Sequence, residues 1–228
     1  MESKEFFSRF ISPFVEKDGL LENLMLQMTE DEMKGKRGPI VLEGSTGLKQ
    51  VSSVKDVIQA IIDAKSEKKI LRVAGSAHSV SDAISHKDGV TLLLTGDLRK
   101  VEIIKEKEED GKKWLYCRIG AGCYLGINPL DRSSNLQNSA CYQLNQKGYG
   151  FPELGGIIHQ SIGGFLSTGS AGGSLKHSFA DVIQDIEFVD GTATRRTAKP
   201  RTDEWCAVGV SMGLFGVITH VSLRLPDR

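Results

Sequence analysis

The sequence predicts an α+β fold, in which helices and antiparallel strands are segregated rather than strictly alternating. An amphipathic helical pattern follows residue 53, and two later pairs of β-rich runs are separated by Asp-Gly turns, at Asp110-Gly111 and Asp190-Gly191. A dipeptide of this kind between two such runs is a strong hairpin signal. Strand, helix and hairpin signals therefore mix without the regular strand–helix alternation of a doubly wound parallel sheet.

The charge balance argues against a nucleic-acid-binding protein. The 228 residues include 29 basic and 29 acidic side chains, so the formal net charge is zero, whereas a general nucleic-acid binder needs a basic surplus. Hydrophobic residues make up 39% and charged residues 25% of the chain, as in ordinary soluble globular proteins. No apolar run approaches the roughly 18 residues of a membrane-spanning helix.

The cysteines and the N-terminal residues indicate the expected cellular compartment. Four cysteines lie at positions 117, 123, 141 and 206, without the close pairing of a zinc knuckle or a redox dithiol. We expect them to be free thiols that pack as small buried hydrophobes in a reducing compartment. Charged residues interrupt the apolar positions near the N-terminus, so no secretory signal is predicted. The expected location is cytoplasmic, with an organelle or a membrane surface as alternatives.

Residues 1–47 are expected to form a helical N-terminal extension and a connector. Up to about residue 35 the apolar positions recur with helical spacing, and the first group is Phe6, Phe7, Phe10, Ile11 and Phe14. The segment could pack on the main body, lie on a membrane surface or mediate assembly. Packing is favoured, because acidic and basic residues mix on the polar side and a membrane-surface helix is usually strongly basic there.

The next elements are a helix and two strands. Ser53 can cap a helix whose buried stripe is predicted to be Val54, Val57, Ile58, Ile61 and Ile62. Lysines near its end suit the negative pole of the helix dipole. A buried strand, Ile70–Val73, then leads into a loop of small residues that contains His78, and Val90–Leu94 forms a second strand.

The remaining chain contains two hairpins and a glycine-rich helix. The expected elements are a hairpin (101–104 and 114–119), an irregular stretch (123–152), a second hairpin (183–189 and 192–197), a short helix (203–211) and a terminal strand (217–225). Within 153–174 the apolar residues have helical spacing from Ile157 to Leu166, which places Gly163 and Gly164 in mid-helix. Each glycine costs a helix about 1 kcal/mol relative to alanine. We therefore expect another group to lie against the backbone there.

Two small-residue loops indicate an anion site. The loops are "AGSAHSVS" and "LSTGSAGGS", and consecutive backbone N–H groups in such loops form anion-binding concavities. Their hydroxyl donors are Ser76, Ser79, Ser81, Ser167, Thr168 and Ser170. Neither loop carries the lysine of a GxxxxGK[ST] motif, so a diphosphate held by N–H groups and hydroxyls is favoured. For either loop alone, a turn without a ligand is the alternative.

Four segments in order resemble a known family. The segments "RVAGSAHSVSD", "QSIGGFLSTGS", "VDGT" and "GLFGVITHVSLRLP" are similar to the signature segments of the FAD-binding, PCMH-type domain of the vanillyl-alcohol oxidase family. Within that family they look most like the sugar-1,4-lactone oxidases and alditol oxidases. The resemblance implies an α+β domain over residues 48–228, with two subdomains and FAD extended between them.

The resemblance also implies cofactor-binding residues. The pyrophosphate loop of the family matches Ala74, Gly75, Ser76, Ala77, His78 and Ser79, the second phosphate-binding segment matches Ser161, Gly164 and Thr168, and the strand beside the cofactor matches Gly216, Val217 and Ile218. In many members the histidine at the position of His78 binds the flavin covalently through its 8α-methyl carbon. A loop histidine that only donates a hydrogen bond is the alternative. Catalytic residues are not assigned, and no metal site is indicated.

The chain departs from the family pattern at the second loop. Members usually read Thr-Gly-Thr-His-Gly where this chain has Thr168-Gly169-Ser170-Ala171-Gly172. His159 and His177 are close in sequence, and each is expected to be structural rather than a replacement. The family's substrate domain is expected to follow residue 228, so a missing domain or a partner chain would complete the active site.

Two kinds of function are compatible with these observations. The first is the FAD-binding part of an oxidase or dehydrogenase that acts on the CH–OH group of a sugar-1,4-lactone or polyol, with oxygen as the expected acceptor. The second is a non-catalytic FAD-binding module or subunit without a complete active site. A reductase of the cell-wall precursor type, which shares the domain architecture, is a third and less favoured interpretation. In each case the substrate or ligand is a small molecule.

Overall fold

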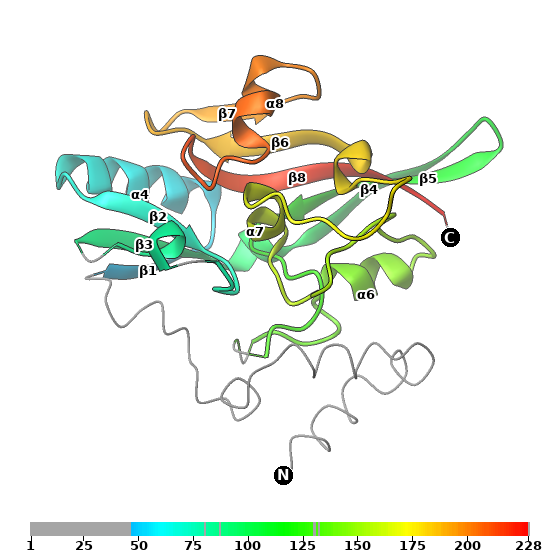
Figure 1. The fold of residues 1–228 in the computed structure, drawn as a ribbon, viewed down its shortest axis with the longest axis horizontal. Helices are drawn as coiled ribbons and strands as arrows, with labels where there is room; N and C mark the ends of the chain where they lie inside the picture. The colour runs from blue at the N-terminus through cyan, green and yellow to red at the C-terminus, as the bar shows by residue number, and fades with distance from the viewer. Residues whose placement is uncertain (1–46, 80, 87, 130, 132, 228) are drawn as a thin grey trace, which may run out of the picture.

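The computed structural model describes residues 47–79, 81–86, 88–129, 131 and 133–227 (Figure 1). The expected N-terminal helical extension, and all but the last residue of the connector, lie outside the described residues. The described part contains a small parallel sheet and a larger antiparallel sheet, which confirms the α+β prediction.

The smaller sheet has three parallel strands. They are β1 (Gly47–Val51), β2 (Ile70–Ala74) and β3 (Gly89–Leu94), in the order β1-β3-β2. Parallel neighbours need crossover connections, and here α4 (Val54–Ser66) joins β1 to β2, while the short α5 (Ser81–Ile84) lies between β2 and β3. The strand at Ile70 is less buried than expected, since Ile70 itself is exposed.

Helix α4 begins where its capping residues predict. The Asp56 N–H donates to Ser53 Oγ at 3.3 Å, and the Ser53 N–H donates to the Asp56 carboxylate at 2.9 Å, which is a complete capping box. The buried face contains Val57 and Ile61. Ile62, which was expected in the buried stripe, is 47% exposed, because it lies one position beyond the apolar face.

The larger sheet has five antiparallel strands. They are β4 (Val101–Glu109), β5 (Lys112–Gly120), β6 (Ile183–Val189), β7 (Arg195–Ala198) and β8 (Val217–Pro226), in the order β4-β5-β8-β6-β7. Asp110 and Gly111 both have positive φ, 53° and 71°, as the two central residues of a type I′ turn require. The first hairpin is longer than predicted, because the charged residues of β4 lie on an exposed edge strand, where water solvates them.

Three further helices complete the described part. They are α6 (Ala140–Asn145), α7 (Ile162–Ser167) and α8 (Asp203–Val208), with single 3₁₀ turns at Gly96–Arg99 (η2) and Phe179–Val182 (η3). Helix α6 lies within 123–152, so the prediction that this stretch is wholly irregular was wrong.

The glycine-rich helix is shorter than its apolar spacing predicts. It begins at Ile162, where Ser161 caps it, so Gly163 and Gly164 lie in its first turn and not at its middle. Ile158 precedes the helix because its carbonyl accepts a hydrogen bond from the Gly126 N–H. That pairing holds the preceding segment in an extended conformation instead of a helix.

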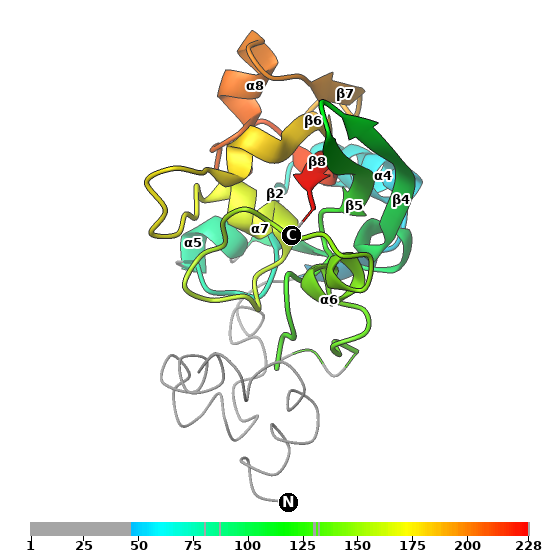
Figure 2. The ribbon, with the colours of Figure 1, turned by 90° about the vertical axis from the view of Figure 1, so that its right-hand side faces the viewer.

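One apolar core joins the two sheets. Figure 2 shows the ribbon turned by 90° from the view of Figure 1. It includes Leu92 of β3, Ile119 of β5 and Leu223 of β8, all fully or almost fully buried. Cys117 and Cys123 are buried as expected, whereas Cys206 is exposed, so that expectation was wrong for this residue. Within the described ranges, no helix combines the length and apolar character needed to cross a bilayer.

The junction of the sheets depends on glycine at position 120. A β-carbon on Gly120 would overlap the backbone carbonyl of Leu98 in η2, while the Gly120 N–H donates to the Lys100 carbonyl at 2.9 Å. We expect Gly120→Ala to lower the free energy of unfolding by about 1–3 kcal/mol, as overpacking a rigid contact does. Urea denaturation would measure the loss, with Gly173→Ala as the control because no atom lies within 4 Å of its β-carbon position. Equal stabilities of the two variants would contradict the prediction.

Candidate cofactor site

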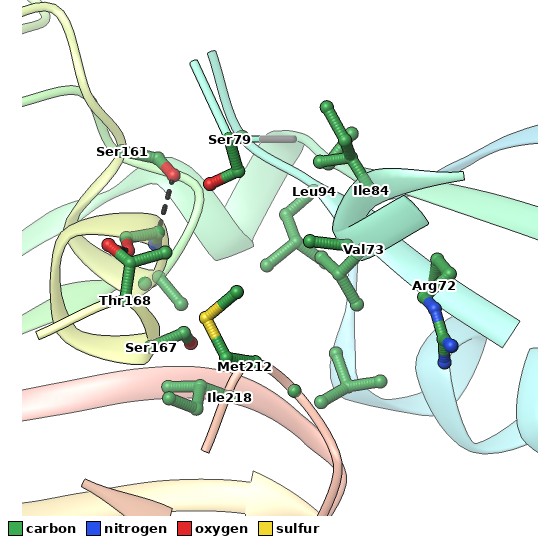
Figure 3. Close-up of a pocket in the computed structure, with 18 of the residues that line it drawn as sticks. Arg72, Val73, Ser79, Ile84, Leu94, Ser161, Ser167, Thr168, Met212 and Ile218 are labelled. Carbon is green, nitrogen blue, oxygen red and sulfur yellow. Dashed lines mark hydrogen bonds between the residues drawn. The ribbon is translucent and has the colours of Figure 1, made fainter. Parts of the chain in front are cut away.

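A cavity of about 280 Å³ lies where the two sheets meet. Its walls come from the carboxyl ends of β2 and β3, from α7, and from the start of β8. Figure 3 shows Ser161, Ser167 and Thr168 on one side, with Val73, Ile84 and Leu94 on the opposite side. Ligands commonly bind at the carboxyl ends of parallel strands, where the chain leaves the sheet in open loops.

The first wall is the loop that follows β2. A β-carbon on Gly75 would overlap Ser161 Oγ, so only glycine lets this loop approach the start of α7 so closely. Ala77 has φ of 60°, a left-handed conformation that is uncommon for a residue with a side chain. The loop therefore turns sharply and is packed against the second wall.

The second wall is the first turn of α7, where the two glycines have different roles. The Gly164 N–H donates to Ser161 Oγ at 3.3 Å. A β-carbon on Gly163 would press on Ala121 at 3.0 Å, whereas one on Gly164 would meet only Ser161 Oγ, at 3.1 Å. Gly163 is thus needed for packing within the protein, and Gly164 leaves space toward the cavity.

The hydroxyls after α7 form an internal network. Thr168 Oγ1 donates to the Gly164 carbonyl at 2.9 Å and lies 3.0 Å from Ser170 Oγ. The Gln160 side-chain amide also donates to Ser170 Oγ, at 3.1 Å. The Thr168 hydroxyl was expected to donate a hydrogen bond to an anion. In the structure its single proton is already used in the hydrogen bond to the Gly164 carbonyl.

Glu153 shapes the loop that departs from the family pattern. Its carboxylate accepts hydrogen bonds from the backbone N–H groups of Gly172 at 3.1 Å and Ser174 at 3.3 Å. A β-carbon on Gly172 would overlap the Leu154 carbonyl. The backbone around Ala171 is therefore held by a carboxylate from the preceding segment.

The third wall is the start of β8 and the rim before it. Gly216 has φ of +145°, and a β-carbon there would overlap the Val189 carbonyl, so glycine lets β8 enter the sheet beside β6. The Met212 N–H donates to the Ser167 carbonyl at 2.9 Å, which ties the rim to α7. Met212 and Leu214 line the cavity and are also exposed, 43% and 74%, so the rim is apolar.

The cofactor-binding residues that the resemblance implies all line this one cavity, whereas Ser170, which was expected as a hydroxyl donor, is not among the described lining residues. The implied residues are Ala74, Gly75, Ser76, Ala77, His78, Ser79, Ser161, Gly164, Thr168 and Ile218, together with Gly216 and Val217. Among the described lining residues, Arg72 and His78 are the only ones with ionisable side chains. A bound anion would therefore meet no carboxylate among them, and no like-charge repulsion from these side chains.

The three histidines of the site region have different environments. The rings of His78 and His159 are in contact, with centroids 4.1 Å apart and planes inclined by 49°. His159 is 3% exposed, whereas His177 is exposed and does not line the cavity. His159 was expected to be structural. That prediction did not anticipate the contact between its ring and the ring of His78.

Two buried titratable groups, Cys123 and Tyr124, directly follow the lining residues Ala121 and Gly122 in the chain. Burial raises the pKa of the Cys123 thiol and of the Tyr124 hydroxyl to about 12 each. Neither group is therefore a nucleophile or a general base near pH 7. Within the described ranges, no group of three or more histidine, cysteine or acidic side chains could hold a metal ion.

Sequence reasoning missed part of the lining. Leu94, Ala121, Gln160 and the rim at Met212 were not singled out, although all line the cavity. The only signal for the rim was the nearby pair Gly213 and Gly216. Apolar cavity walls look like ordinary core positions in a sequence, since both are read from the same hydrophobic pattern.

Comparison with curated proteins shows that the chain is similar in sequence to lactone oxidases. The chain is 26% identical over 179 residues to L-gulonolactone oxidase of Mus musculus, 27% identical over 179 residues to D-arabinono-1,4-lactone oxidase of Kluyveromyces lactis, and 27% identical over 183 residues to that of Saccharomyces cerevisiae. Each match covers 77% of this chain but only 31–36% of the relative. The chain thus spans about a third of the length of these relatives. No family model matches it.

Comparison with solved structures identifies the fold. The VAO-type flavoprotein MtVAO615 from Myceliophthora thermophila superimposes with a TM-score of 0.62 at 19% identity, over 79% of this chain and 31% of that protein. Cholesterol oxidase from Brevibacterium sterolicum gives a TM-score of 0.59 at 15% identity, over 79% and 34%. The fold expected from the sequence, that of VAO-type flavoproteins, is confirmed.

Proposed function

We propose that this chain, whose homologues are 1,4-lactone oxidases and whose fold is that of VAO-type flavoproteins, is the FAD-binding part of an oxidoreductase acting on CH–OH groups. The substrate class is a sugar-1,4-lactone or a polyol, and oxygen is the acceptor. One observation carries the proposal. Three segments far apart in the sequence, chosen for their resemblance to FAD-binding segments, line a single cavity.

The residues of the cavity fit FAD in shape and charge. Gly164 leaves space where any side chain would intrude, and the lining residues described include no carboxylate. When bound, FAD accepts a hydride from a CH–OH carbon and passes the electrons to an acceptor such as oxygen. This chain binds and orients the cofactor, and the catalytic base belongs to a further domain or a partner chain.

The phosphate groups are assigned to the two small-residue loops. Backbone N–H groups and the hydroxyls of Ser76, Ser79 and Ser161 are the donors, because such loops neutralise an anion without a fixed cation. The apolar side chains of Val73 and Leu94 supply the wall opposite α7. Ile218 of β8 lies beside the cofactor on the remaining side.

His78 is assigned the covalent bond to the flavin. An imidazole ring nitrogen is a nucleophile of the kind that forms covalent bonds to electrophilic carbons. His78 follows Ala77 in the loop that packs against α7, so it lies at the cavity rather than beyond it. The bond would join an imidazole nitrogen to the 8α-methyl carbon in place of one C–H bond. The N–H and C–H protons would leave, the two electrons would reduce the flavin, and oxygen as the acceptor would reoxidise it to give peroxide.

The domain limits and location are part of the proposal. Residues 48–228 are assigned to the FAD-binding domain, residues 1–47 are assigned to the N-terminal extension and connector, and the assigned location is cytoplasmic. Free cysteines at positions 117, 123, 141 and 206 support a reducing compartment. Organelle and membrane-surface locations are the alternatives.

We expect the purified protein to bind FAD near-stoichiometrically, because the loops, the glycines and the acid-free lining fit this cofactor. An absorption spectrum before and after acid precipitation measures the flavin and separates extractable from protein-bound cofactor. A folded preparation that stays colourless after incubation with FAD would refute the proposal.

A non-catalytic FAD-binding module is the second candidate. Arg72 and His78 are the only ionisable side chains among the described lining residues, which leaves no carboxylate or lysine there to act as a general base. Peroxide formation by the flavin-loaded protein on a panel of sugar-1,4-lactones and polyols separates the two functions. The isolated chain is expected to show little turnover, and the chain joined to a complete active site is expected to show robust turnover.

A further inference from the structure

His159 is positioned rigidly beside the cavity. The segment that carries it runs antiparallel to residues 124–126, where the Gly126 N–H donates to the Ile158 carbonyl and the Leu125 N–H donates to the Gln160 carbonyl at 2.9 Å. Both backbone neighbours of His159 are therefore hydrogen-bonded to the protein body. The ring is 3% exposed, so the surrounding atoms restrict its rotamer.

His78 has the opposite environment. It is exposed, follows a residue with positive φ, and lies on a loop that is outside regular structure. Exposed side chains change rotamer on the picosecond to nanosecond timescale. The ring contact, with centroids 4.1 Å apart, thus joins an exposed side chain on a loop to a buried one.

We propose that His159 is a positioning residue, whose ring fixes the orientation of the His78 ring at the cavity. The inference rests on the proposed FAD site for its functional meaning, but not for its geometry. Aromatic rings in contact attract one another in preferred relative orientations, beyond the effect of the area that they bury. A contact of that kind favours one ring orientation over the others, and a preorganised ring meets a ligand at a smaller entropic cost.

The first test uses the protein without flavin. In ¹³C-labelled protein, the ring Cε1–Hε1 signal of His78 is assigned by its absence in His78→Ala. His159→Ala is expected to shift this signal toward the value of a freely rotating histidine. His159→Phe, which keeps an aromatic ring in the buried position, is expected to leave the signal close to wild type, and His177→Ala, at an exposed histidine, is the control.

Two results of the first test would overturn the proposal. One is a His78 signal in His159→Ala that is identical to wild type. The other is a folded His159→Phe variant whose His78 signal matches that of His159→Ala, since this would show that ring packing is not what holds His78.

The second test couples the contact to FAD. Stopped-flow quenching of flavin fluorescence measures the first encounter with FAD, before any slower covalent step. His159→Ala is expected to weaken FAD capture by about 3- to 10-fold in the wild-type background, and to have almost no effect in the His78→Ala background. An equal loss in both backgrounds would make His159 a general packing residue and would refute its action through His78.

The two proposals fail in different ways. If the wild-type protein captures no FAD, the proposed function is refuted, while the ring signal still decides whether His159 orients His78. If FAD binds normally and the ring signal does not respond to His159→Ala, the cofactor site stands and the positioning role is refuted.

Discussion

Gly164→Val is expected to abolish FAD retention while leaving the chain folded. The β-carbon at this position would meet only Ser161 Oγ and otherwise extend toward the cavity. Two further methyl groups would occupy space assigned to the cofactor. Overpacking of a well-fitted contact costs about 1–3 kcal/mol, which weakens FAD binding by about 5- to 150-fold. Flavin absorbance after gel filtration, together with the unfolding midpoint, measures both effects.

The neighbouring glycines supply the controls. Gly163→Val is expected to destabilise the fold, because its β-carbon would press on the Ala121 backbone and side chain at 3.0 Å. Gly173→Val is expected to change neither property, because the space around that position is open. If Gly164→Val keeps its flavin, or loses it only together with its fold, the assignment of Gly164 to the cofactor wall is wrong.

His78→Ala is expected to convert the flavin from covalently bound to fully acid-extractable. Alanine has no nucleophilic nitrogen, so no bond to the 8α-methyl carbon can form, whereas the loops that hold the phosphates are unchanged. The experiment uses the protein with its active site complete, since flavin attachment needs a fully formed site. Mass spectrometry of tryptic peptides locates the adduct, and acid precipitation measures the fraction of flavin that is attached.

His177→Ala is the matched control for that experiment, because this histidine is exposed and lies outside the cavity lining. It should keep the wild-type fraction of attached flavin. An unmodified His78 peptide from the wild-type protein, alongside fully extractable FAD, would show that His78 only positions the cofactor.

Much of the fold was predictable because its signals are local. The cap of α4 depends on Ser53 and Asp56, three residues apart, and the turn of the first hairpin depends on the Asp110-Gly111 dipeptide. The sharp loop after β2 was predictable from its own small residues. In each case the deciding interaction is between residues that are close in the chain, so it can be predicted from the sequence.

The shorter α7 and the separate roles of its glycines were not predictable in this way. Apolar spacing from Ile157 to Leu166 suits a helix, but the Gly126 N–H binds the Ile158 carbonyl and excludes that segment from the helix. Gly163 and Gly164 are adjacent and identical in type. Only the position of Ala121, more than forty residues earlier in the chain, distinguishes the packed one from the open one.

By itself the sequence determined the α+β class, the order of the predicted helices and strands, and the small residues that line the cavity. Tertiary structure alone decided that Gly75 lies against Ser161, that Met212 and Leu214 form the rim, and that His159 contacts His78. The physical reason is distance along the chain. Capping and turn chemistry act within a few residues, whereas these contacts arise only after apolar burial has brought two sheets together around one core.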